Sequence, residues 1–277
     1  MPDEVGPVIV DSHTHVASPD TKRFPMRPQG FGSDWWRTAG GSAQVLDAMD
    51  AAGVDLAVVV QAVGPYGFDC ACAIDAVQEH GDRFRFVGAV DTAGPDPVAA
   101  LARLADTGLL RGVRLFGVGA TEATWLTDGT GRDLWDAAAD LGTTIIATVF
   151  DRHLADLRTL VEQRPDVRVA LDHCGFPDVT GGPPFAAAAG LFALADLRPL
   201  HLKATTHLLH EGADPADVMD ALVGAFGADR VAWGSDFPQT TELDYPGMVD
   251  LARRAVRRLP NDAQNAVLGG TAARLWA

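Results

Sequence analysis

Two histidines spaced two residues apart, His13 and His15, are the first side chains in this sequence that could do chemistry. They follow the apolar run 8–10 and the acid Asp11. Side chains alternate faces along a strand, so we expect Asp11, His13 and His15 to share one face of a first strand. Two imidazoles that converge at a strand end favour a site for a divalent metal. Two histidines this close also occur by chance, so the pattern alone leaves both interpretations open.

Two further polar residues follow predicted strands later in the chain. His173 lies in segment 170–175, after the sixth predicted strand, and Asp236 lies in segment 233–238, after the eighth. Three histidines and a carboxylate are ligands that a divalent metal prefers. The same groups also suit activation of water without a metal, with the carboxylate as the base. The residues by themselves leave these two alternatives open.

An alternation of apolar strands and helical segments would position these residues. The chain has 277 residues, of which 47% are hydrophobic, enough for one large core. We expect eight strands, at residues 8–10, 56–60, 85–90, 112–116, 144–149, 167–171, 200–204 and 230–233. A helical segment after each strand predicts an α/β fold, the (β/α)8 TIM barrel, as a single domain over residues 1–277. In such a barrel the strand ends meet at one rim, where active sites are built.

Several helices have recognisable starts. Ser42 can cap a helix that runs to about Ala51, and Asp214 can cap one that has Pro215 in its first turn. The other predicted helices are 69–79, 97–105, 131–139, 153–163, 184–195, 246–259 and 261–276.

Charge and composition exclude some classes of protein. The net charge of −15 argues against nucleic-acid binding, although a few local cations could still hold a small anionic substrate. No apolar run reaches the roughly 18 residues of a membrane span. The acidic start at residues 1–4 is unlike a secretory signal, which predicts a cytoplasmic protein. The three cysteines, Cys70, Cys72 and Cys174, are too few for a disulfide framework.

Taken together, these motifs resemble those of the amidohydrolase superfamily, in particular its amidohydrolase-2 branch. The segments that show the resemblance, in chain order, are DSHTH at 11–15, VVVQ at 58–61, YGFD at 66–69, GVRL at 112–115, LDHCG at 171–175, WGSDFP at 233–238 and GGTAARLW at 269–276. Within that branch the pattern is most similar to the lactonase group, which includes the 2-pyrone-4,6-dicarboxylate hydrolases.

The resemblance implies roles for individual residues. His13, His15 and Asp236 match the family's metal or catalytic positions, and His173 matches its strand-six histidine. Arg114 matches a contact to a substrate carboxylate. Further candidate substrate-binding residues are Lys203 on the seventh strand, Gln61 and Tyr66 in the segments quoted above, and Trp35 in the loop after the first strand.

Departures from the family pattern bear on the metal. The related decarboxylases have a histidine ligand at the end of strand five, where this chain has residues 147–150, and His153 falls later. No lysine ends strand four or five, so we do not expect a two-metal site. The resemblance implies one divalent metal, Zn or Mn, at His13, His15, Asp236 and His173, or catalysis without a metal. A second pair, His207 and His210, is more typical of rim contacts or exposed side chains.

We therefore predict an enzyme, a hydrolase that opens a lactone or a similar cyclic ester of a small, carboxylated and hence anionic molecule. Asp236 would activate water beside His13 and His15. One alternative is a metal-dependent decarboxylase of an aromatic or muconate-type acid, and another is a non-catalytic barrel that binds a metabolite. We expect no nucleic-acid or membrane partner, and the sequence leaves a homo-oligomer open.

Overall fold

The strands of this protein form one parallel sheet that follows the chain order from β1 to β8. The computed structural model describes residues 8–29, 34–118, 122–210 and 212–277, so the acidic start at 1–4 lies outside the described residues. The strands are β1 (Val10–Thr14), β2 (Leu56–Val60), β3 (Phe84–Val90), β4 (Leu110–Phe116), β5 (Thr144–Thr148), β6 (Val169–Leu171), β7 (Leu200–Thr205) and β8 (Val231–Gly234). The first strand therefore extends into the histidine segment, beyond the predicted 8–10.

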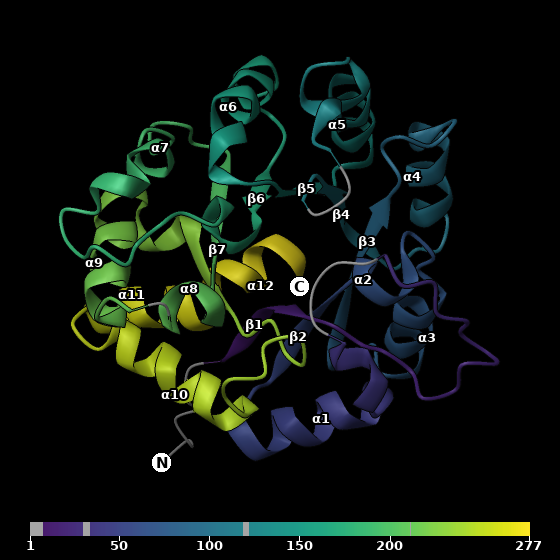
Figure 1. The fold of residues 1–277 in the computed structure, drawn as a ribbon, viewed down its shortest axis with the longest axis horizontal. Coiled ribbons are helices and arrows are strands. Elements are labelled where there is room, and N and C mark those ends of the chain that lie inside the picture. Colours follow the sequence, from purple (N-terminus) through teal and green to yellow (C-terminus); the bar gives the residue numbers. More distant parts are fainter. Residues whose placement is uncertain (1–7, 30–33, 119–121, 211) are drawn as a thin grey trace, which may run out of the picture.

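Helices connect the strands and surround the sheet, which confirms the predicted (β/α)8 barrel (Figure 1). They are α1 (Gly41–Ala52), α2 (Val63–Tyr66), α3 (Ala71–Glu79), α4 (Pro97–Ala105), α5 (Thr130–Leu141), α6 (Leu154–Gln163), α7 (Ala189–Phe192), α8 (Thr206–His210), α9 (Pro215–Phe226), α10 (Tyr245–Val256), α11 (Asn261–Asn265) and α12 (Thr271–Trp276).

Two helix predictions need correction. Ser42 does not cap α1, because the cap residue is Gly40 and no side chain makes a cap hydrogen bond there. Residues 184–195 do not form one helix but a 3-10 turn, Ala186–Ala188, and the short α7. The predicted cap of α9 is confirmed, since the Asp214 side chain accepts a hydrogen bond from the Ala216 amide.

The barrel closes where the end of β8 meets β1. The Asp236 amide donates to the His13 carbonyl at 2.8 Å, and the His15 amide donates to the Phe237 carbonyl at 2.8 Å. Gly234 makes this approach possible, because a Cβ at this position would lie 2.8 Å from the His13 Cβ. Closure therefore places Asp236 directly beside the two histidines of β1.

The barrel interior is filled by side chains. Val10, Val58, Ile146 and Ala170 from the strands pack there in one buried cluster with Trp276 of α12. Figure 1 shows α12 and the C-terminus near the middle of the ring of helices. A second and larger buried cluster packs the helices onto the outside of the strands. Among the described helices we find none with the length and apolar character that a membrane crossing requires.

Candidate active site

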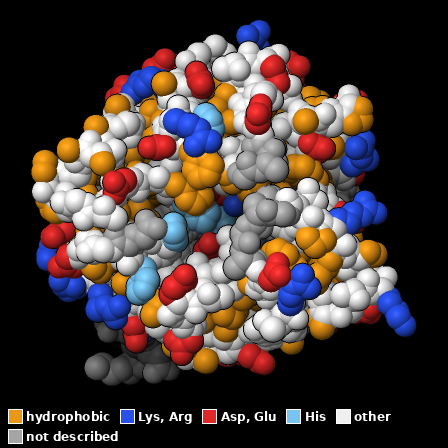
Figure 2. All heavy atoms as spheres, viewed as in Figure 1, with side chains coloured by type: hydrophobic (Ala, Val, Ile, Leu, Met, Phe, Trp, Pro, Cys, Tyr) orange, Lys and Arg blue, Asp and Glu red, His pale blue; other side chains and the backbone are white. Residues whose placement is uncertain are grey.

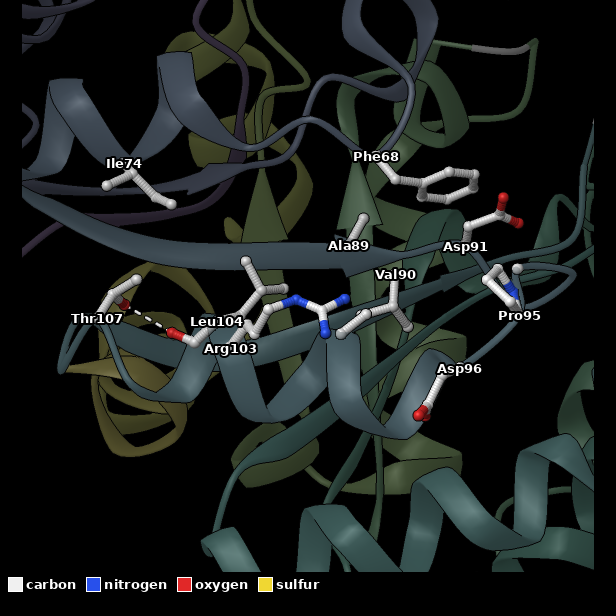
Figure 3. A pocket seen from close by; sticks show the side chains of 12 residues that line it. Phe68, Ile74, Ala89, Val90, Asp91, Pro95, Asp96, Arg103, Leu104 and Thr107 are labelled. Atoms are coloured by element: carbon white, nitrogen blue, oxygen red, sulfur yellow. Dashed lines mark hydrogen bonds between the residues drawn. The ribbon is translucent and has the colours of Figure 1, made fainter.

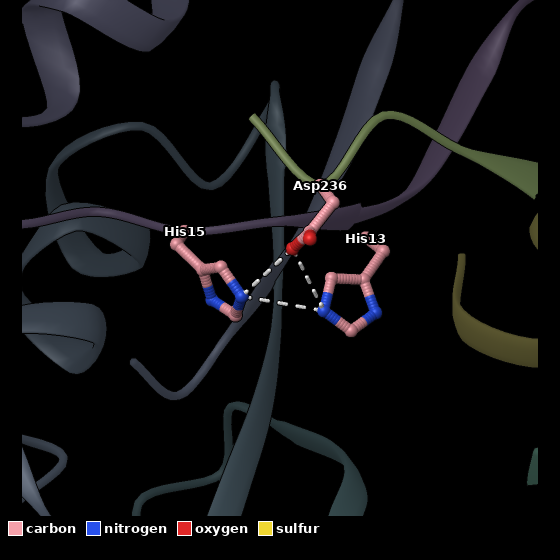
Figure 4. A group of neighbouring side chains, drawn as sticks. All are labelled: His13, His15 and Asp236. Carbon is pink, nitrogen blue, oxygen red and sulfur yellow. Dashed lines mark hydrogen bonds and ion pairs between the residues drawn. The ribbon is translucent and has the colours of Figure 1, made fainter. Parts of the chain in front are cut away.

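Three polar atoms converge at the junction of β1 and β8 (Figure 4). The Nε2 atoms of His13 and His15 lie 3.3 Å apart. Asp236 Oδ1 lies 3.3 Å from His15 Nε2 and 3.6 Å from His13 Nε2. All three side chains are buried. Such a set, with each ligand atom close to the other two, has the composition of a metal-binding group.

The outer ring nitrogens of the two histidines fix where their protons lie. His15 Nδ1 is 2.8 Å from the Val60 carbonyl oxygen, which can only accept, so Nδ1 donates. His13 Nδ1 is 3.1 Å from Asp172 Oδ1 and donates to that carboxylate. A neutral imidazole has a single N–H, so both Nε2 atoms present lone pairs. This is the arrangement by which proteins orient histidine ligands of a metal.

Two lone pairs and a carboxylate oxygen therefore face one another with no proton between them. Among the described residues, the buried Asp236 Oδ1 atom has no hydrogen-bond partner. Unpaired buried acceptors are costly, and a cation placed between them would satisfy all three. The residues thus fit a divalent metal. Zinc takes nitrogen and carboxylate ligands readily, and this donor set also suits other first-row metals.

Asp172 is the residue that sequence reasoning missed. Its fully buried carboxylate accepts from Arg114 Nε at 2.8 Å, from Thr148 Oγ1 at 2.7 Å and from His13 Nδ1 at 3.1 Å. Lys203 Nζ lies 3.2 Å away. Burial opposes ionisation, but Lys203, His13 and Arg114 hold the pKa of Asp172 well below its ordinary value. The carboxylate therefore stays ionised and anchors His13. In the sequence, the feature that could have identified Asp172 is its position next to His173 at the end of a predicted strand.

Asp236 and His173 both occupy left-handed backbone conformations, with φ of 61° and 53°. Non-glycine residues rarely adopt this conformation, and it clusters at functional sites. Burial acts to raise the pKa of Asp236, but its three histidine neighbours, His15, His173 and His13, lower it below its ordinary value. Burial lowers the pKa of His173 to about 4, so its ring is neutral at neutral pH. His173 Nδ1 pairs with Thr205 Oγ1 at 2.9 Å.

Comparison with known proteins places this site in a family. The sequence profile of the amidohydrolase family matches residues 10–277. The chain belongs to the amidohydrolase family. It is a hydrolase of that family, as the sequence analysis predicted.

Three relatives of this amidohydrolase share between 18% and 26% of its sequence. An L-fucono-1,5-lactonase of Burkholderia ambifaria is 26% identical over 280 residues, which cover 96% of this chain and 94% of that protein. A crystal structure of an amidohydrolase from Burkholderia multivorans with bound zinc is 24% identical, with a TM-score of 0.74 over 97% of this chain and 98% of the other. A probable 2-pyrone-4,6-dicarboxylic acid hydrolase of Acinetobacter baumannii, with citric acid bound, is 18% identical, with a TM-score of 0.75 over 96% and 98%. The two structures share the fold.

Two predicted substrate-binding cations of the amidohydrolase lie in the Asp172 network. Arg114 is buried, and besides its bond to Asp172 it donates from Nε to Thr148 and from Nη1 to the Gln61 carbonyl. Lys203 is fully buried, and its Nζ lies 4.8 Å from the Trp276 ring centre. Both cations therefore balance the charge of Asp172.

The other predicted substrate contacts lie around β1 and β2. Gln61 donates its amide to the carbonyls of Gly67 and Asp69, and the Tyr66 hydroxyl accepts from the Ser18 amide at 2.9 Å. These bonds hold the loops after the two strands. Trp35 stacks beside the His15 ring, with the ring centres 6.0 Å apart, and its buried Nε1 finds no hydrogen-bond partner in the described part of the chain.

One expectation about β1 was wrong. The pairing of β1 with β2 shifts register between Asp11 and Thr14, so Asp11 and His13 do not share a face. The Asp11 carboxylate instead accepts from the Ser235 amide and from the Tyr245 hydroxyl of the outer helix α10, each at 2.8 Å. Asp11 thus braces the β1–β8 junction from outside.

The remaining histidines lie apart from the metal ligands. His207 and His210 are exposed on α8, as expected of rim residues. His153 ends the 3-10 turn before α6, and β5 ends at Thr148, so no strand-five histidine joins the described site.

Surface shape agrees with this location of the site. Figure 2 shows a hollow near the centre of one face, with histidine side chains in and around it. A separate cavity of about 520 Å³ lies between β3 and α4, and its lining includes Ala89, Asp96 and Leu104 (Figure 3). That lining contains none of the three candidate metal ligands.

Proposed function

We propose that this amidohydrolase opens a lactone, with one divalent cation held by His13, His15 and Asp236. The convergence of two imidazole lone pairs and an unpaired carboxylate oxygen is the observation that supports the proposal. The bound cation would supply a Lewis acid that polarises the ester carbonyl. The name of the fuconolactonase relative, at 26% identity, supports a lactone as the substrate class.

Asp236 would serve as the proton acceptor in this reaction. Its pKa lies below the ordinary value, so it is ionised at neutral pH and can take a proton from the attacking water. Its Oδ2 lies 3.4 Å from both Gln239 Nε2 and Thr240 Oγ1, which orient the carboxylate. After ring opening, the same carboxyl group would return the proton to the leaving alkoxide.

His173 would orient the ester carbonyl. If the Thr205 hydroxyl donates to Nδ1, the neutral ring has its N–H at Nε2 and can donate to the developing oxyanion. A preorganised donor of this kind contributes about 3–4 kcal/mol to transition-state stabilisation. The predicted carboxylate contact of Arg114 would have to use Nη2, because Nε and Nη1 already donate within the protein.

The decarboxylase alternative receives less support from the site. The corresponding ligand position at the end of β5 is Thr148, whose hydroxyl donates to Asp172. The non-catalytic alternative predicts ligand binding with no turnover. Both alternatives are distinguished from the proposal by assaying ring opening and carbon dioxide release on the same protein.

The test is the variant Asp236→Asn, assayed for hydrolysis of δ-valerolactone with a pH indicator. We expect kcat to fall by about 10²–10⁴-fold, because the amide cannot accept the proton. Asp178→Asn, a matched change of an exposed carboxylate in the loop after β6, should leave kcat unchanged. An unchanged kcat in Asp236→Asn, with parental Tm, would overturn the assignment.

A further inference from the structure

Half-buried phenylalanines line one side of the rim next to the catalytic site. Phe150 and Phe176 follow the ends of β5 and β6, and neither is fully covered. They pack on a small buried cluster at the same rim, formed by Val63, Ala89, Phe116 and Val118. We call Phe150 and Phe176 the phenylalanine wall; Phe68 packs on the same cluster but lines the separate cavity between β3 and α4. The cluster beneath the wall is separate from both the barrel interior and the outer core.

The wall begins at the reacting centre. The Phe176 ring stacks against His173, with ring centres 4.6 Å apart, and the His173 ring centre lies 4.9 Å from that of His13. Phe150 extends the wall outward, 5.3 Å from Phe176 between ring centres. Figure 2 shows hydrophobic side chains beside the histidines at the central hollow. A substrate whose carbonyl reached His173 would therefore place its neighbouring atoms against phenyl rings.

The opposite side of the centre is polar. Asp236, Gln239 and Thr240 supply carboxylate, amide and hydroxyl groups after β8. The site thus has one polar side, where water is activated, and one apolar side. The phenyl rings themselves offer no hydrogen-bonding group. Two polar side chains also contact them, Arg152 at 4.6 Å from the Phe150 ring centre and His207 at 6.3 Å from that of Phe176. A substrate hydroxyl held against the rings, away from these two side chains, would lose its hydration without compensation.

We propose that the substrate is a lactone with an alkyl or aryl substituent, and that the phenylalanine wall holds this substituent. The inference rests on the proposed lactonase function and adds the substrate class. Polyhydroxylated sugar lactones would bind poorly at this wall, because their hydroxyl groups need polar partners. An alkyl chain would instead gain from leaving water, since removal of apolar surface from water is favourable.

The test compares kcat/KM for δ-decalactone, which has a pentyl substituent, with that for unsubstituted δ-valerolactone and polyhydroxylated D-glucono-δ-lactone. We expect δ-decalactone to be preferred over each of the others by at least about tenfold, the effect of even one well-placed methylene. The preference should lie mainly in KM, because the substituent is remote from the reacting bond.

Substitution of a wall residue gives the second measurement. Phe150→Gln should lower kcat/KM for δ-decalactone about tenfold more than kcat/KM for δ-valerolactone, whereas Phe150→Leu should retain most of the preference. Phe192→Gln is the matched control, because Phe192 is also half-buried but lies on α7 in contact with Phe185. Phe176→Gln, measured as the same ratio of kcat/KM values, replaces Phe150→Gln if that variant does not fold.

The outcomes separate this inference from the proposed function. If none of the three lactones is hydrolysed, the lactonase proposal fails, and the inference fails with it. If δ-valerolactone is hydrolysed but δ-decalactone is not preferred, or the wall variants keep the preference, only the inference on the substituent is overturned.

Discussion

Asp172→Asn should destabilise the fold, because it removes the negative charge of a fully buried carboxylate that pairs with Arg114 and Lys203. Removing one partner of a buried ion pair costs about 3–5 kcal/mol. For a chain of 277 residues, an unfolding entropy of roughly 0.6 kcal/mol per kelvin converts this cost into a fall of about 5–9 °C in Tm. Scanning calorimetry measures the fall.

The same substitution should weaken metal binding. An asparagine amide can donate to His13 Nδ1, which would shift the ring proton to Nε2, the atom that faces Asp236. Loss of a hydrogen-bond partner behind a metal ligand typically costs about 10–100-fold in metal affinity. Titration with Zn²⁺ against a competing chelator, at a temperature where the variant is folded, measures this loss separately from stability.

A double-mutant cycle tests whether the cost comes from the unpaired cation. The double variant Asp172→Asn/Lys203→Met lacks one of the two cations as well as the carboxylate. Its loss of unfolding free energy should therefore be smaller than the sum of the losses in the two single variants, by about 0.5–3 kcal/mol. Asp178→Asn provides the control for the loss of a carboxylate at an exposed position. Parental Tm and parental zinc affinity in Asp172→Asn would refute the reasoning.

Two further predictions concern barrel closure and the cation. Gly234→Ala should lower stability by about 1–3 kcal/mol and impair activity, because its Cβ would meet His13 Cβ at 2.8 Å and Ser12 Oγ at 2.9 Å. Gly224→Ala on α9, where a Cβ meets nothing within 4 Å, should be neutral or stabilising in the same denaturant melts. Removal of the metal by a chelator should lower kcat roughly hundredfold, because a metal Lewis acid contributes several kcal/mol to transition-state stabilisation. Added Zn²⁺ or Mn²⁺ should restore it, and metal analysis showing two ions per chain would contradict the single site.

Local sequence pattern was sufficient for the elements of the fold. The apolar run at Leu56–Val60 became β2 with the predicted bounds, and Pro97–Ala105 became α4. Strand and helix periods, proline positions and caps depend on neighbouring residues, so they can be recognised from the sequence without knowledge of the fold. Boundaries failed where distant contacts decide. Residues 184–195 had helical composition, but a left-handed Phe185 begins a turn there instead.

The sequence predicted the residues of the candidate site better than the contacts that position them. His13, His15 and Asp236 were expected at one rim because each follows the end of a strand, and the structure brings them together. Asp172 was adjacent to a predicted residue, yet its importance depends on Lys203, Arg114 and Thr148 from three other strands.

The sequence by itself determined the strand and helix order, and with it the edge of the barrel that the polar residues share. Only the tertiary structure decided which atoms meet there. Register and closure set those pairings, as when a one-residue shift in β1 accompanies the contact of the Asp11 carboxylate with the Tyr245 hydroxyl of α10. The physical reason is that side-chain direction along a strand is a local property, whereas a partner across the barrel depends on how all eight strands are aligned.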